Sequence, residues 1–133
     1  MTTIKIIASS ILLLTCSALF IFAQSGADNP DCSIVKKGKF KYLDIEDTTA
    51  YFEIDGSSHT EYHNGGKYYI KSNLEWLDEC RYSMKMLENT IPDFPFRPGA
   101  VMVVSIQKIK NNIIYYTSTV NNQSWKGKLR KIE

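Results

Sequence analysis

The residues best able to do chemistry lie in one short stretch, "HTEYHNGGKYYI", residues 59–70. His59 and His63 are the 2 histidines of the chain, and Glu61 lies midway between them. Because the side chains of a β-strand alternate between its two faces, a strand here places all three on one side. Two imidazoles and a carboxylate on one face have the right chemistry to hold a metal ion or to position a proton.

A metal site is the weaker interpretation of this stretch. A zinc ion needs three or four protein ligands at about 2 Å, and successive residues on one strand face lie roughly 6.5–7 Å apart. His59 with Glu61, or Glu61 with His63, is therefore a feasible pair, and further ligands must be Asp or Glu. The simplest interpretation is the polar, wet face of a hairpin strand, with His63 against the turn. On that interpretation replacing both histidines with Gln leaves the fold intact, and we expect no metal, no other cofactor and no catalytic residue.

Glu61 is the more informative residue, and its role depends on which face points inward. If Thr60 and Tyr62 face solvent, Glu61 and the histidines face the interior, where Glu61 would select the polar group of a ligand. If the faces are reversed, Glu61 is only solvated. Tyrosine suits either side, so the sequence leaves both orientations open.

Aromatic and methionine side chains form a second candidate site on two neighbouring segments. Parity places Ile70, Leu74 and Trp76 on one face. It places Tyr82, Met84 and Met86 together after the next turn. The set predicts a hydrophobic core, and the functional alternative is a pocket wall for an apolar ligand, to which Met adds adaptability. The candidate ligand-binding residues are Glu61, His59, Trp76 and Tyr82.

The elements that must position these residues have an apolar period of two, typical of strands. The predicted strands are 39–45, 50–54, 58–63, 67–77, 80–86, 100–109, 113–120 and 124–132. Turn residues separate them, and "NGG" at 64–66 is the strongest signal. Eight short strands with tight turns predict a small all-β antiparallel meander barrel, since closure removes exposed edges. A helix was the alternative for "LDECRYSMKMLEN", but its alternation favours a strand.

One connection is long, residues 87–99, and its three prolines exclude it from a sheet interior. Phe94 and Phe96 lie between those prolines, so we expect this segment to pack down as a lid or plug. An eight-stranded barrel is just wide enough to be filled by side chains or to hold one small ligand.

The chain begins with a segment typical of a secretory signal. Lys5 precedes the apolar run "IIASSILLLTCSALFIF", and a small residue, Ala23, offers a cleavage point before the polar "QSGADNPD". We expect a signal peptide at 1–23, a flexible segment at 24–31 and one domain at 32–133. A lipoprotein cut before Cys16 is the less favoured alternative. The predicted location is therefore secreted or periplasmic, with no membrane span left after cleavage.

Two cysteines remain after cleavage, Cys32 and Cys80. An even count in an exported protein predicts a disulfide. The loop of about 49 residues that it closes corresponds to on the order of 3–4 kcal/mol of stabilisation. The remaining charge, 15 Lys and Arg against 14 Asp and Glu, gives no electrostatic reason to expect a nucleic-acid partner.

Several motifs resemble those of a family of small exported bacterial envelope proteins. Members begin Cys…Gly-x-Phe, carry a polar-x-Glu pair and share Trp, two or three residues, then Cys-x-Tyr. Here these motifs are Cys32 with "GKF" at 38–40, "HTE" at 59–61 and "WLDECRY" at 76–82. The resemblance implies an envelope location and a β fold, but no reaction. "GKF" is also similar, by analogy, to the Gly-x-Trp opening of lipocalin-like barrels, with Phe40 in place of the Trp.

These observations favour a non-enzymatic binding module for a small, partly apolar ligand. The alternative is an envelope domain with a filled core that contacts another protein. A metal-assisted hydrolase using His59, Glu61 and His63 is the third hypothesis. A hollow barrel favours the first and a solid barrel with an exposed tyrosine patch favours the second.

Overall fold

The computed structural model describes residues 29–133. The predicted signal peptide at 1–23, the cleavage point at Ala23 and the lipoprotein alternative at Cys16 lie outside the described residues, as does most of the segment 24–31. Within residues 29–133, no helix is long and apolar enough to cross a membrane.

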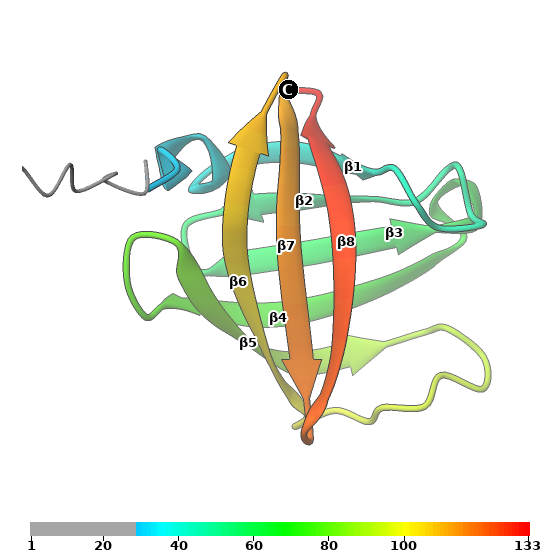
Figure 1. Ribbon diagram of the computed structural model, residues 1–133. Helices are drawn as coiled ribbons and strands as arrows, with labels where there is room; N and C mark the ends of the chain where they lie inside the picture. The colour runs from blue at the N-terminus through cyan, green and yellow to red at the C-terminus, as the bar shows by residue number, and fades with distance from the viewer. Residues whose placement is uncertain (1–28) are drawn as a thin grey trace, which may run out of the picture.

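The described chain forms a closed antiparallel barrel in which each strand pairs with its neighbours in sequence and β1 pairs with β8. This confirms the predicted all-β meander barrel. The strands are β1 (Gly38–Tyr42), β2 (Tyr51–Asp55), β3 (Ser58–His63), β4 (Tyr68–Trp76), β5 (Arg81–Asn89), β6 (Val101–Lys110), β7 (Ile113–Val120) and β8 (Gln123–Lys131). Two short 3-10 turns accompany them, η1 (Cys32–Val35) and η2 (Asn64–Gly66). Figure 1 shows β6, β7 and β8 crossing the run of β1 to β4.

Asparagine pairs make the tightest turns of the meander. Asn111 and Asn112 join β6 to β7 with φ of 53° and 61°, and Asn121 and Asn122 join β7 to β8 with φ of 47° and 67°. Positive φ at both central residues is the condition for the type I′ turn, whose twist matches that of paired strands. These turns hold β6, β7 and β8 in register.

The barrel has two different ends, which we call the closed end and the open end. The closed end carries η1 and the turns at 56–57, 77–80 and 111–112, and Val35 of η1 is fully buried over it. Phe40, Ile54 and Ile114 fill this half of the interior, each at 1% exposure or less. The open end carries the connections at 43–50, 64–67, 90–100 and 121–122 (Figure 1).

Cys32 and Cys80 form a disulfide at the closed end, with their Cα atoms 5.3 Å apart. The bond ties η1 to the connection between β4 and β5. It confirms the predicted pairing and is compatible with an oxidising, exported location.

Two predicted strand boundaries differ by three residues from the observed ones, and both lie at the open end. The first strand was expected to continue to residue 45 but ends at Tyr42, because Asp47 begins a turn that ties the chain to η2. The fifth was expected to end at residue 86 but continues to Asn89. A bulge leaves Leu87 without a partner on β4, so pairing resumes at Glu88.

Candidate ligand-binding site

The open half of the barrel is hollow. A cavity of about 290 Å³ lies inside it, bounded by inward-facing residues of every strand. Its walls are mainly aromatic and aliphatic side chains, among them Phe52, Met84, Met86 and Val104. The volume lies near the lower limit of the usual range for small-molecule sites, about 300–1,000 Å³. The cavity can therefore hold one small molecule.

His59 lies on β3 and faces the cavity, with only 2% of its surface exposed. Its ring stacks on Phe52 of β2, with ring centres 4.6 Å apart. The wet hairpin face expected from the sequence was thus wrong. Parity placed His59, Glu61 and His63 on one side, but that side is the interior. Burial lowers the pKa of His59 to about 4, so the imidazole is neutral near pH 7.

The Nδ1 atom of His59 is buried and has no hydrogen-bond partner among the described residues. Buried polar atoms in folded proteins nearly always have a partner, because an unpaired one costs about 1–3 kcal/mol. His59 lines the cavity with other atoms of its ring, since Nδ1 itself has almost no accessible surface.

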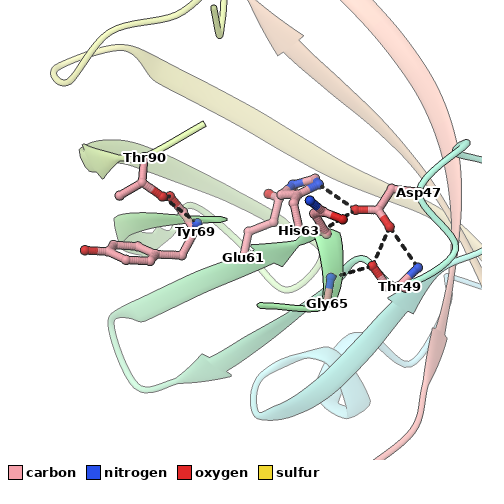
Figure 2. Close-up of polar contacts among 8 residues, drawn as sticks. Asp47, Thr49, Glu61, His63, Gly65, Tyr69 and Thr90 are labelled. Carbon is pink, nitrogen blue, oxygen red and sulfur yellow. Dashed lines mark hydrogen bonds and ion pairs between the residues drawn. The ribbon is translucent and has the colours of Figure 1, made fainter. Parts of the chain in front are cut away.

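Glu61 and His63 form a hydrogen-bonded pair on the cavity wall nearest the open end. Nε2 of His63 lies 2.6 Å from Oε1 of Glu61, and Nδ1 lies 3.6 Å from Oδ2 of Asp47 (Figure 2). Both side chains of the closer pair are about four-fifths buried, with 20% and 19% exposed. The hydrogen bond to Glu61, with the charges of Glu61 and Asp47, raises the pKa of His63. The group therefore holds two carboxylates around one imidazole.

Asp47 and Thr49 also hold the 43–50 connection against η2 through hydrogen bonds, which together we call the Asp47 latch. Asp47 Oδ2 accepts the Asn64 backbone N–H at 2.7 Å, and Asp47 Oδ1 accepts that of Thr49 at 2.9 Å. Thr49 Oγ1 in turn accepts the Gly65 N–H at 2.8 Å (Figure 2). The hydrogen bonds that Asp47 accepts from Asn64 and Thr49 lower its pKa to about 2. The latch fixes one side of the cavity entrance.

Three tyrosines surround Glu61 from other strands: Tyr42 of β1, Tyr82 of β5 and Tyr116 of β7. Burial raises the pKa of each phenol, and the charge of Glu61 raises it further. All three stay protonated at physiological pH and keep a hydroxyl donor. The cavity thus contains one carboxylate within a largely aromatic wall.

Gly127 on β8 is the cross-strand partner of Tyr116. A Cβ atom at this glycine would overlap the Tyr116 ring. Because Gly127 has no side chain, the Tyr116 ring can pack against the inner face of β8 at this position.

Aromatic rings line the entrance. Phe94 and Phe96 of the 90–100 segment have ring centres 5.9 Å apart, and Phe96 lies 6.1 Å from Trp125 of β8. All three line the cavity. The segment is pinned where it starts, since the Tyr69 N–H donates to Thr90 Oγ1 at 2.8 Å (Figure 2). The predicted packing of both phenylalanines over the barrel agrees with this arrangement.

Trp76 is the one predicted ligand-binding residue that the structure places away from the cavity. It lies at the closed end, 4.9 Å from the Tyr82 ring, with Lys36 Nζ 3.4 Å from its ring centre. Parity correctly put it on the inner face, but β4 is long enough for its last residue to reach the filled half. Glu61, His59 and Tyr82 line the cavity together.

Within residues 29–133, no group of three or more His, Cys, Asp or Glu side chains is arranged to hold a metal ion. The His59 ring stacks on Phe52, while His63 contacts Glu61 and Asp47. The arrangement offers hydrogen bonds and charge to a bound molecule.

Asp47, Tyr116 and Trp125 also belong to this site and were not predicted from the sequence. Alternation places Tyr116 on the face of Ile114, which was a usable signal. Asp47 had no such signal, because its role depends on a contact with η2, 17 residues away.

Comparison with protein-family models, curated proteins and solved structures finds no match to this chain.

Proposed function

We propose that this protein is a non-enzymatic binding module that holds a small, partly apolar molecule in the barrel cavity. The observation that carries the proposal is the hollow open half, about 290 Å³ with mainly apolar walls. A filled barrel would be more stable, because unfilled core volume costs free energy. A cavity with a few convergent polar groups is the usual form of a ligand site.

Two features support ligand binding over a packing defect. Glu61 presents a carboxylate to the interior. The entrance is ordered by the Asp47 latch on one side and by the 90–100 segment on the other.

The proposed location is secreted or periplasmic, following cleavage of a signal peptide near Ala23. The disulfide between Cys32 and Cys80 supports export, and the resemblance to exported envelope proteins agrees with it. The envelope-interaction alternative required a filled core, so the cavity favours the ligand carrier.

A cavity-filling variant tests the proposal. Ser118 is buried and lines the cavity, whereas the next residue, Thr119, faces outward on the same strand. Small aromatic and aliphatic molecules should raise the melting temperature of the wild type, because a ligand of the native state stabilises it. Thr119→Phe should keep this response and Ser118→Phe should lose it. Equal responses in Ser118→Phe and the wild type would place binding outside the cavity and contradict the proposal.

A further inference from the structure

The charge inside the cavity has one dominant sign. Among the described residues that line it, Glu61, His59 and His63 are the titratable groups besides the tyrosines, and no lysine or arginine is present. His59 is neutral near pH 7 because of its burial. Asp47 lies 3.6 Å from His63 and adds a second carboxylate at the entrance. Two carboxylates against a single imidazole leave this region negative in either protonation state of His63.

The surroundings of Glu61 are aromatic and apolar. Its register partners are Phe52 on β2 and Ile70 on β4, both buried. Tyr42, Tyr82 and Tyr116 lie close enough for its charge to oppose ionisation of their hydroxyls. Aromatic faces attract cations through the negative face of the ring. A carboxylate among aromatic rings is a favourable place for an organic cation.

His59 adds a neutral imidazole to the same wall, one inward position along β3 from Glu61. Its ring stacks on Phe52, which is the register partner of Glu61 on β2. The wall beside the Glu61 carboxylate is therefore made of flat rings that carry no positive charge near pH 7.

We propose that the cavity binds a small amine in its ammonium form, with an aromatic or branched apolar body. The ammonium group pairs with the Glu61 carboxylate, and the apolar body lies against Phe52, Met84 and Met86. This inference rests on the proposed function, since it names the class of molecule that the carrier holds. A carboxylate ligand fits poorly, because it would meet the negative charges of Glu61 and Asp47 with His63 as the one counter-charge near them among the lining residues.

Three probe molecules that share an aromatic ring but differ in charge test the proposed class of ligand. At pH 7, 2-phenylethylamine is a cation, 2-phenylethanol is neutral and phenylacetate is an anion. Calorimetric titration into the oxidised chain should give the amine about tenfold or higher affinity over the alcohol, since a charge-assisted hydrogen bond contributes about 1.5–3 kcal/mol. Phenylacetate should bind most weakly.

Variants that remove one negative charge test whether Glu61 causes the higher affinity for the amine. Glu61→Gln should abolish the preference for the amine over the alcohol, whatever its effect on the affinity of the alcohol itself. Glu75→Gln removes the same charge from an exposed position on β4 and should change neither. An amine preference that survives in Glu61→Gln would overturn the assignment of the site.

The affinities of the three probes for the wild-type protein are enough to distinguish the amine proposal from the more general carrier proposal. Alcohol or phenylacetate binding as tightly as the amine overturns the amine class and leaves the carrier function standing. Absence of binding by all three probes overturns both. The result expected is the order amine, alcohol, phenylacetate.

Discussion

Burial of His59 makes the stability of the barrel depend on pH in a defined window. The folded protein holds this imidazole neutral, with a pKa of about 4 against an ordinary value of 6.5. Between these two values the unfolded chain binds more protons than the folded one, so the free energy of unfolding falls as the pH falls. The stabilisation is present above pH 6.5 and is lost on the way down to about pH 4.

The size of the effect follows from the two pKa values. One pKa unit corresponds to about 1.4 kcal/mol. The full gap therefore gives about 3 kcal/mol, of which about 2.5 kcal/mol is lost between pH 7.5 and pH 4.5. This is a large share of the ~5–15 kcal/mol that stabilises a small domain.

His63 and Asp47, whose pKa values are also shifted, act mainly outside this window. His63 has a raised pKa, so its stabilising contribution is present below pH 6.5 and is lost as the pH rises through its folded value. Asp47 has a pKa of about 2, so its contribution is lost below its ordinary pKa of 3.8. The fall between pH 6.5 and 4.5 therefore reports chiefly on His59.

Urea denaturation of the oxidised wild type and of two variants at pH 7.5, 6.5, 5.5 and 4.5 measures this dependence. His63→Gln should keep the fall between pH 6.5 and 4.5, while His59→Gln should show a fall smaller by about 2 kcal/mol over the same range. The comparison uses slopes, because each substitution also shifts the absolute stability. A wild-type curve that stays flat over this range, or an unchanged slope in His59→Gln, would refute the burial of a neutral His59.

Three further predictions concern the supports of the cavity. Reducing the Cys32–Cys80 disulfide should lower the free energy of unfolding by about 3–4 kcal/mol, measured by urea denaturation with and without reductant; no change would contradict its role as a staple. Gly127→Ala should cost about 1–3 kcal/mol, because its Cβ overlaps the Tyr116 ring, and a melting temperature equal to that of the wild type would contradict this contact. Asp47→Ala removes a carboxylate from His63 and should lower the pKa of His63, measured by NMR titration of the imidazole; an unchanged value would show that Glu61 alone sets it.

Much of the fold was accessible from the sequence because alternation and turn chemistry act locally. Val, Ile, Tyr and Thr with a period of two indicated the strands, and asparagine pairs marked the tightest turns. The disulfide followed from the expected export. Boundaries failed where a tertiary contact decides them, as at Tyr42, where the latch of Asp47 on η2 ends β1.

The site was only partly accessible, for a geometric reason. A period of two groups His59, Glu61 and His63 on one face, but it does not say which face is inward. Tyr51 and Tyr62 stack outside, with ring centres 4.9 Å apart, so aromatic character alone did not mark the interior. Alternation also does not show how far along the barrel axis a residue lies. Trp76 was therefore grouped with Tyr82, although only Tyr82 lines the cavity.

The central claim is that the open half of the barrel holds a molecule. Native mass spectrometry of the protein isolated from the cells that produce it tests this claim most directly. The account predicts one organic molecule per chain, added to the mass of the disulfide-bonded protein, lost in Ser118→Phe and retained in Thr119→Phe. A wild-type chain that carries no added mass under gentle conditions, and takes up none of the small aromatic probes, would contradict it.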